Sequence, residues 1–300
     1  MRRTDLGRNL LILVMAWGAL TAGVEVSWGA SGTVSERKAP LRIAVAAMIS
    51  PEGTLSVYQE LMDYIAAKLD RPVEIKQRRT YQEVNDMLGT GKLDAAILCS
   101  GTYVHARRQY GVELLAVPVI NGSPTYRSYI IVPSSSTAAS LEELHRKRFA
   151  FTDPLSTSGY LYPVYALVSR GRQPATFFAK TLFTYSHDNS IEAVAEGVVD
   201  GAAVDSLIYD YLQVSNPALV ARTRIIHRSP PFGAQPVGVP KSLDPATKRA
   251  LRDLFLGMDQ DPEGKRILKQ LGVDRFIPGE DRMYDSIRKM LRVVEGARFP

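Results

Sequence analysis

The chain has 300 residues, of which 45% are hydrophobic and 23% charged, a composition typical of a folded protein rather than a disordered one. Its net charge of +6 is spread along the chain without a basic, aromatic-interleaved stripe, so no nucleic-acid partner is predicted. The length allows one large core or two smaller lobes. The single cysteine, Cys99, closes an apolar run and is expected to be a buried core residue.

The first thirty residues have the layout of a secretory signal peptide. Arginines precede an apolar run over residues 10–22, and a polar segment follows at residues 31–40. The apolar run is short for a membrane span, and Glu25 interrupts its extension. We therefore expect a signal peptide over residues 1–30, a linker over 31–40 and a periplasmic mature protein. An uncleaved anchor remains an alternative, because Trp28 stands where a cleavage site favours a small residue.

From residue 41 the sequence alternates between strand and helix patterns. Strands are predicted over residues 41–47, 73–77, 93–99, 113–119 and 125–132, with helices over 55–69, 81–88 and 102–110 and a turn over 50–53. Alternation of this kind predicts a parallel sheet, whose ligand groups gather in the loops at the C-terminal ends of the strands. The serine-rich run after Pro133 is interpreted as a loop or hinge.

A second α/β unit follows, and the chain then returns to the first. Its elements are predicted over residues 141–146, 149–151, 161–169, 181–185, 190–196, 201–205 and 224–228. A return strand is predicted over 235–240, followed by helices over 245–258 and 282–294. Two lobes explain this order better than one long sheet. Lobe 1 is assigned residues 41–133 plus 237–300, and lobe 2 residues 134–236.

The segment from Phe149 to Tyr162 carries the strongest chemical signal. A short strand leads through an Asp-Pro turn to three consecutive hydroxyls, Ser156, Thr157 and Ser158, then to a glycine and a helix. The backbone N–H groups at a helix N-terminus and adjacent small hydroxyls are donors for an oxyanion. The alternative is that Ser156 or Thr157 only caps the helix.

Several segments together resemble the periplasmic binding proteins of phosphonate, phosphite and phosphate ABC transporters. They include Tyr81-Gln-Glu-Val, Gly91-Lys-Leu-Asp-Ala-Ala-Ile, Thr125-Tyr-Arg-Ser, Asp153-Pro-Leu-Ser-Thr-Ser-Gly-Tyr, Ser186-His-Asp-Asn-Ser and Ser229-Pro-Pro-Phe. The similarity covers about residues 41–295. It implies the type II fold, in which two α/β lobes joined by two hinge strands close on a phosphorus oxyanion in the interlobe cleft. It also implies ABC permease subunits as partners, and we expect a monomer.

The resemblance implies a set of ligand-binding residues: Ser156, Thr157 and Ser158 at the helix N-terminus, with Tyr81, Tyr126, His187 and Asp205. Each has an ordinary alternative: core or surface tyrosines, a solvated loop histidine, and an aspartate that caps the following helix. The turn Cys99-Ser-Gly-Thr-Tyr103 departs from the Gly-Pro turn of many relatives. Ser100 or Thr102 is therefore a candidate additional donor, and Tyr103 a further candidate contact.

No enzyme is predicted, because the catalytic signatures are missing. The glycines of a nucleophile elbow are absent around Ser158, and the four histidines stand about forty residues apart, without a metal-binding pair. There is no phosphate-binding loop and no dinucleotide fingerprint, so no metal or cofactor is expected. A ligand-sensing extracytoplasmic module for a signalling receptor remains the alternative to transport, because both functions can use the same closing fold.

Overall fold

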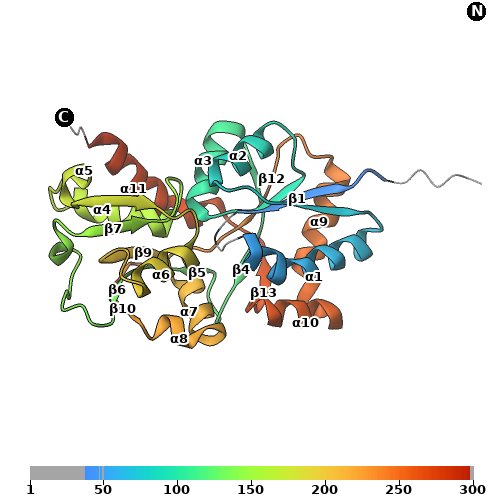
Figure 1. Ribbon diagram of the computed structural model, residues 1–300. Helices are drawn as coiled ribbons and strands as arrows, with labels where there is room; N and C mark the ends of the chain where they lie inside the picture. The colour runs from blue at the N-terminus through green and yellow to red at the C-terminus, as the bar shows by residue number, and fades with distance from the viewer. Residues whose placement is uncertain (1–37, 47, 49–50, 298–300) are drawn as a thin grey trace, which may run out of the picture. The chain divides into compact units, whose positions relative to one another are not determined.

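The computed structural model describes residues 38–46, 48 and 51–297, with the backbone alone for residues 51–57. The predicted signal peptide and most of the predicted linker lie outside the described residues. Among the described residues, no helix has both the length and the hydrophobicity needed to cross a membrane. The chain builds two main β-sheets, each flanked by helices (Figure 1).

The first sheet has six strands in the order β13-β4-β12-β3-β1-β2. Their bounds are β1 (Leu41–Val45), β2 (Val73–Lys76), β3 (Ala95–Ile97), β4 (Glu113–Val119), β12 (Val237–Val239) and β13 (Arg275–Ile277). Strand β1 lies parallel to β2 and β3, as predicted for this part of the chain. The return strand β12 runs antiparallel between β3 and β4, and the edge strand β13 pairs antiparallel with β4.

The helices that follow these strands are α1 (Pro51–Leu69), α2 (Tyr81–Gly89), α3 (Ser100–Tyr110), α9 (Pro245–Gly257), η3 (Met258–Gln260) and α10 (Pro262–Gln270). Helix α1 begins at Pro51, so the predicted turn over 51–53 is wrong. Proline fits the first helical turn because the N–H it lacks has no partner there. At α2 a capping box holds the N-terminus: Thr80 accepts from the Glu83 N–H, and the Glu83 carboxylate accepts from the Thr80 N–H.

The second sheet has five strands in the order β10-β6-β9-β7-β8. Their bounds are β6 (Ser128–Pro133), β7 (Arg148–Phe151), β8 (Lys180–Phe183), β9 (Gly201–Asp205) and β10 (Thr223–Arg228). Strands β7, β8 and β9 are parallel, whereas β6 is antiparallel to both β9 and β10. Because β6 pairs on both sides within this sheet, its assignment to lobe 1 is wrong. The chain changes sheets before Ser128, through β5 (Thr125–Tyr126), which pairs with β11 (Phe232–Gly233).

The helical segments after β6 are η1 (Glu142–Leu144), η2 (Thr157–Leu161), α4 (Tyr162–Val168), α5 (Pro174–Phe177), α6 (His187–Ala195), α7 (Ser206–Ser215), α8 (Pro217–Val220), η4 (Asp281–Tyr284) and α11 (Asp285–Gly296). Helix α11 contacts α4 and η2, and Figure 1 shows it in red beside α4. It also contacts α3, so this helix packs mainly on the second lobe and partly on the first, whereas the sequence assigns all of residues 237–300 to the first. The apolar face of α11 includes Ile287 and Met290, which are buried in one cluster with apolar residues of α4.

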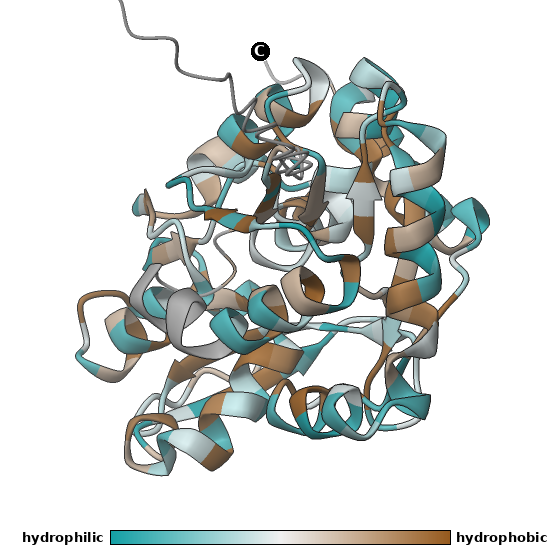
Figure 2. Ribbon diagram, turned by 90° about the vertical axis from the view of Figure 1, so that its right-hand side faces the viewer, coloured by the Kyte–Doolittle hydropathy of each residue, from teal (hydrophilic) through white to brown (hydrophobic). Residues whose placement is uncertain are grey.

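Apolar side chains fill the space between strands and helices. In Figure 2 hydrophobic segments occur in the strands, and hydrophobic and hydrophilic residues alternate along the helices. In the second lobe Phe149 of β7 stacks on Phe178 with ring centroids 4.3 Å apart, and Phe151 meets Tyr160 at 5.1 Å. These contacts fix the strand that leads into the three hydroxyls. Cys99 is buried, as predicted.

Both lobes use the same ion-pair clamp at the start of a strand. Arg42 donates to Asp94 through its side chain (3.0 and 3.1 Å) and its backbone N–H (2.8 Å), and its guanidinium also reaches the Gly91 carbonyl. In the second lobe Arg148 makes the corresponding bonds to Asp200 and to the carbonyl of Gly197. The Gly-x-x-Asp segments of the two lobes are thus equivalent in structure.

We expect Asp94→Ala to lower the free energy of unfolding by about 2 kcal/mol, because it removes charge-assisted bonds to a backbone N–H and to a guanidinium. Asp200→Ala is the matched control, with a smaller expected loss. The side chain of Asp200 is 35% exposed, against 13% for Asp94, so water replaces its bonds more readily. Urea unfolding of both variants checks this order, and an equal loss would contradict it.

Candidate functional site

Two helix N-termini, one from each lobe, meet at the centre of the predicted site. Ser100 is the first residue of α3, Thr157 is the first of η2, and their hydroxyl oxygens lie 3.1 Å apart. The approach is close because Gly101 has no side chain. A Cβ at Gly101 would lie 2.7 Å from both the carbonyl oxygen of Leu155 and the hydroxyl oxygen of Thr157. The candidate donor Ser100 therefore lies beside the predicted hydroxyl cluster.

Tyr126 extends this contact into a chain of three hydroxyls. Its hydroxyl lies 2.7 Å from the Ser100 oxygen, which in turn contacts Thr157. Burial is the main cause that raises the pKa of the Tyr126 phenol, so this group stays protonated at neutral pH. Each hydroxyl can donate and accept, so the chain can direct a hydrogen toward an anion. Tyr126 is thus in the predicted place, on the segment that connects the two sheets.

The other two predicted hydroxyls differ in their bonding. The Ser156 oxygen accepts from the Gly159 N–H at 3.0 Å, which is the capping role weighed for it. The Ser158 hydroxyl is buried and has no hydrogen-bond partner. The turn itself is π-helical: the Leu161 N–H donates to the Ser156 carbonyl at 2.9 Å. Wide turns of this kind occur frequently at functional sites.

His187 is the first residue of α6, and not a loop residue as expected, because the helix begins directly after the extended Ser186. Its Nδ1 accepts from the Asp205 backbone N–H at 3.1 Å and lies 3.1 Å from the Thr152 hydroxyl. A backbone N–H can only donate, so Nδ1 is the unprotonated nitrogen and Nε2 carries the hydrogen. Burial lowers the pKa of His187 to about 3, so the ring is neutral at neutral pH.

Three predicted residues therefore offer buried donors without a partner among the described residues: the Tyr81 hydroxyl, the Ser158 hydroxyl and His187 Nε2. The hydroxyls of Thr102 and Ser186 share this state. Leaving such a group unpaired costs about 1–3 kcal/mol. Unpaired buried donors of this kind suit an anion, because an anion accepts several hydrogen bonds at once.

Asp205 lies next to this cluster and does cap the following helix. Its Oδ1 accepts from the Leu207 N–H at 2.8 Å, and its Oδ2 accepts from the Gln235 side-chain amide at 2.5 Å. Burial raises the pKa of Asp205 to about 7 against the opposing effect of these bonds. The acidic group is therefore close to half-protonated at neutral pH. Its capping role leaves a ligand role open, since each oxygen can accept a second bond.

Tyr103 does not join the cluster. Its hydroxyl donates to Asp281 at 2.8 Å, and its ring lies 4.8 Å from that of Tyr284. Both partners lie in η4, far along the chain, so no local pattern predicts this contact. The carbonyl of Thr102, the other residue weighed at this turn, accepts from the Asn85 amide at 3.1 Å.

Asp153 is a site residue that the sequence reasoning missed. Its Oδ2 accepts from the Tyr81 backbone N–H at 3.1 Å, which connects the second lobe to the N-terminus of α2 in the first. Its Oδ1 accepts from the Leu155 N–H at 2.8 Å and shapes the turn before Ser156. In the sequence the Asp-Pro pair indicates only a turn, and the contact with α2 is not visible there.

The lobes also meet at His187. Its backbone N–H donates to the Met48 carbonyl in the first lobe at 3.0 Å. Two residues earlier, Tyr185 has a φ of 61°, a strained value for a bulky residue, and its ring lies 5.1 Å from the Arg79 guanidinium. Strain of this kind is often stored at ligand sites. Among the described residues, no three His, Cys, Asp or Glu side chains form a group that could hold a metal ion.

Comparison with known proteins identifies the family. Residues 43–284 match the model of the family described as "ABC transporter, phosphonate, periplasmic substrate-binding protein". The chain belongs to this family. The matched range contains the whole site described above, from Tyr81 to Gln235.

Relatives in the phosphonate-binding protein family cover different shares of the chain. The phosphonates-binding periplasmic protein of Escherichia coli is 32% identical over 174 residues, which are 57% of this chain and 51% of that protein. The match thus spans about half the length of that relative. A probable phosphite-binding ABC transporter protein of Prochlorococcus marinus, PhnD1, is 24% identical over 70% of this chain and 71% of its own length.

Solved structures confirm the expected two-lobed type II fold. The binding-protein component of an ABC phosphonate transporter from Pseudomonas aeruginosa superposes with a TM-score of 0.81 at 24% identity, over 86% of this chain and 87% of that one. PhnD1 in complex with methylphosphonate superposes with a TM-score of 0.77 at 22% identity, over 86% of this chain and 98% of that one. At these identities the likeness concerns the fold alone.

Proposed function

We propose that this chain captures a phosphorus oxyanion (a phosphonate, phosphite or phosphate) outside the cytoplasm and delivers it to the permease of an ABC importer. The observation that carries the proposal is the set of buried, unpaired and neutral donors: Tyr81 Oη, Ser158 Oγ and His187 Nε2. They come from both lobes, so one ligand can bond to both. Ser156, Thr157, Ser100, Tyr126 and Asp205 complete the proposed site.

The family supports delivery to a permease over the sensing alternative, because its model is described as the substrate-binding protein of an ABC transporter. It also supports a periplasmic location, with export through the signal peptide expected at residues 1–30. The unpaired groups can donate hydrogen bonds to an anion, and none of them is an activated nucleophile. This supports binding without catalysis. His187 cannot act as the base for a serine, because its Nδ1 is occupied by the Asp205 N–H and its Nε2 carries the hydrogen.

A thermal-shift panel of the mature protein tests the function. Phosphate, phosphite, methylphosphonate and 2-aminoethylphosphonate are compared with sulfate and selenate. Each bond from a fixed neutral donor to an oxyanion contributes about 1.5–3 kcal/mol, so a micromolar or tighter complex is expected. Ligand at a hundred times its Kd stabilises the folded state by about 2.7 kcal/mol, which is several degrees in Tm. A shift with sulfate and selenate alone would overturn the phosphorus assignment.

Binding is expected to weaken as the pH rises through about 7. The pKa of Asp205 is raised to about 7, so below this value the carboxyl is neutral and does not repel an anion beside it. Above this value, binding either requires a proton to be taken up by Asp205 or places the anion beside a charged carboxylate. The affinity therefore falls by up to about tenfold per pH unit. The neutral ring of His187 adds no dependence between pH 4 and 9, since its pKa is about 3.

Methyl methylphosphonate, a monoester with a single charge, is the appropriate probe, because its own charge is constant over this range. Asp205→Asn is the control and should bind it equally at pH 6 and pH 9. A wild-type affinity that is constant over the same range would remove Asp205 from the vicinity of the ligand.

A further inference from the structure

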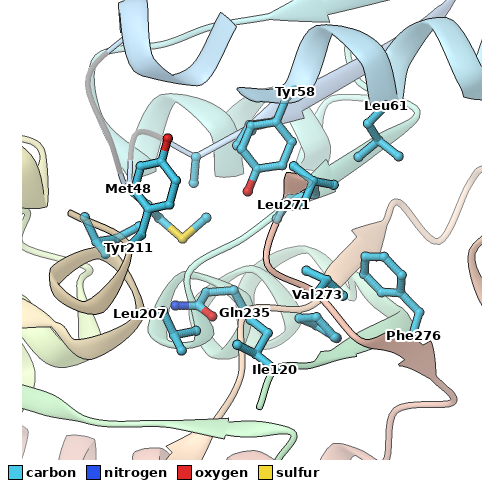
Figure 3. Close-up of a pocket in the computed structure, with 15 residues that line it drawn as sticks. Met48, Tyr58, Leu61, Ile120, Leu207, Tyr211, Gln235, Leu271, Val273 and Phe276 are labelled. Atoms are coloured by element: carbon cyan, nitrogen blue, oxygen red, sulfur yellow. The ribbon is translucent and has the colours of Figure 1, made fainter. Parts of the chain in front are cut away.

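An apolar pocket adjoins the proposed anion site. The space measures about 870 Å³ when the part open to solvent is included, and residues of both lobes line it. Figure 3 shows Met48, Leu207 and Tyr211 on one side and Val273 and Phe276 on the other, with Gln235 between them. None of the lining residues carries a charge. We call this space the apolar pocket.

Direct bonds connect the apolar pocket to the anion site. Gln235, which lines the pocket, donates to Asp205 at 2.5 Å, and Asp205 in turn donates its backbone N–H to His187. Helix α7, which Asp205 caps, supplies Leu207 and Tyr211 to the pocket wall. Met48, another wall residue, accepts from the His187 N–H. The hydrogen-bond network that holds His187 is therefore continuous with the pocket wall.

The polar groups of the pocket are few and neutral. Gln235 already donates to Asp205. Burial, with the charge of Asp205, raises the pKa of Tyr58 to about 12, so its phenol remains protonated. The pocket lining itself therefore carries no charged group, and Asp205 lies next to it. An alkyl or aryl group gains free energy from burial in such a lining.

We propose that the apolar pocket holds the organic substituent of the ligand, so that this protein prefers phosphonates with an alkyl or aryl group over phosphate and phosphite. This inference rests on the proposed function and deepens it. The anion site holds the phosphorus oxygens, and Leu207, Tyr211, Val273 and Phe276 select the substituent.

Titration calorimetry of the wild-type protein tests this preference directly. Along the series methyl-, ethyl-, propyl- and butylphosphonate, affinity should rise by up to about fourfold per buried methylene. Phosphate and phosphite, which have no organic substituent, should bind at least tenfold more weakly than butylphosphonate. Equal affinities, or an affinity that falls as the chain grows, would overturn the inference.

Filling the pocket provides the second measurement. Val273→Phe should bring the ratio of butyl- to methylphosphonate affinity down towards one. Val198→Phe makes the same change at a residue that is 50% exposed and outside the pocket, and should keep the wild-type ratio. If the wild type binds methylphosphonate without a gain from longer chains, this inference fails and the proposed function stands. If it binds no phosphonate, phosphite or phosphate, both fail. The wild-type series decides even if Val273→Phe does not fold.

Discussion

Replacing Gly101 with alanine is expected to weaken methylphosphonate binding by on the order of a hundredfold while leaving the free energy of unfolding nearly unchanged. The added Cβ would lie 2.7 Å from the Leu155 carbonyl and from the Thr157 hydroxyl, both in the opposite lobe. The N-termini of α3 and η2 would have to separate, which moves the donors of one lobe away from a ligand held by the other. Each lobe keeps its own core, and alanine favours the helix in which Gly101 lies.

Gly257→Ala is the matched control, because a Cβ there meets no atom within 4 Å and Gly257 also lies in a helix. Calorimetry gives the affinities, and urea unfolding gives the stabilities. A Gly101→Ala protein that binds methylphosphonate as tightly as the wild type would show that the two helix N-termini need not meet for binding.

Exchanging His187 for asparagine should weaken binding by between about tenfold and a hundredfold, the range for one hydrogen bond to a charged group. Asparagine retains an acceptor near the position of Nδ1, so the Asp205 N–H remains bonded. It has no atom at the position of Nε2, so the donor to the ligand is lost. The stability of the unliganded protein should therefore change less than it would with alanine.

His145→Asn makes the same exchange at an exposed histidine outside the site and should leave the affinity unchanged. The loss in His187→Asn should also be the same at pH 5 and pH 8, because the ring is neutral in both conditions. An effect that appears only at pH 5 would indicate a cationic histidine and contradict the assigned tautomer. Unaltered binding would remove His187 from the site.

The fold could be predicted from the sequence where local patterns determine it. The strands β1, β2 and β3, the helices between them and the two-lobed arrangement all follow from apolar periodicity and from the resemblance. The split between β5 and β6 could not be predicted, because residues 125–132 have continuous strand propensity. The break arises at Arg127, whose backbone exchanges bonds with Ser206, a tertiary partner. The packing of α11 on α4 likewise depends on a tertiary contact between segments far apart in the chain.

Several of the predicted site residues contact one another in the structure, but their bonding could not be predicted. Sequence spacing indicated that Ser156 and Ser158 lie at one helix N-terminus, yet only the structure distinguishes the capping hydroxyl of Ser156 from the unpaired hydroxyl of Ser158. The tautomer of His187 depends on the Asp205 backbone, and the role of Asp153 depends on α2 in the other lobe. These contacts join residues far apart in the chain, which no local pattern reports.

A crystal structure of the protein with methylphosphonate is the most direct test of the central claim. The account predicts phosphonate oxygens within about 2.6–3.2 Å of Tyr81 Oη, Ser158 Oγ and His187 Nε2, with the methyl group directed past Asp205 towards the apolar pocket. A phosphonate bound elsewhere, with these three donors still unpaired or paired only with water, would contradict it.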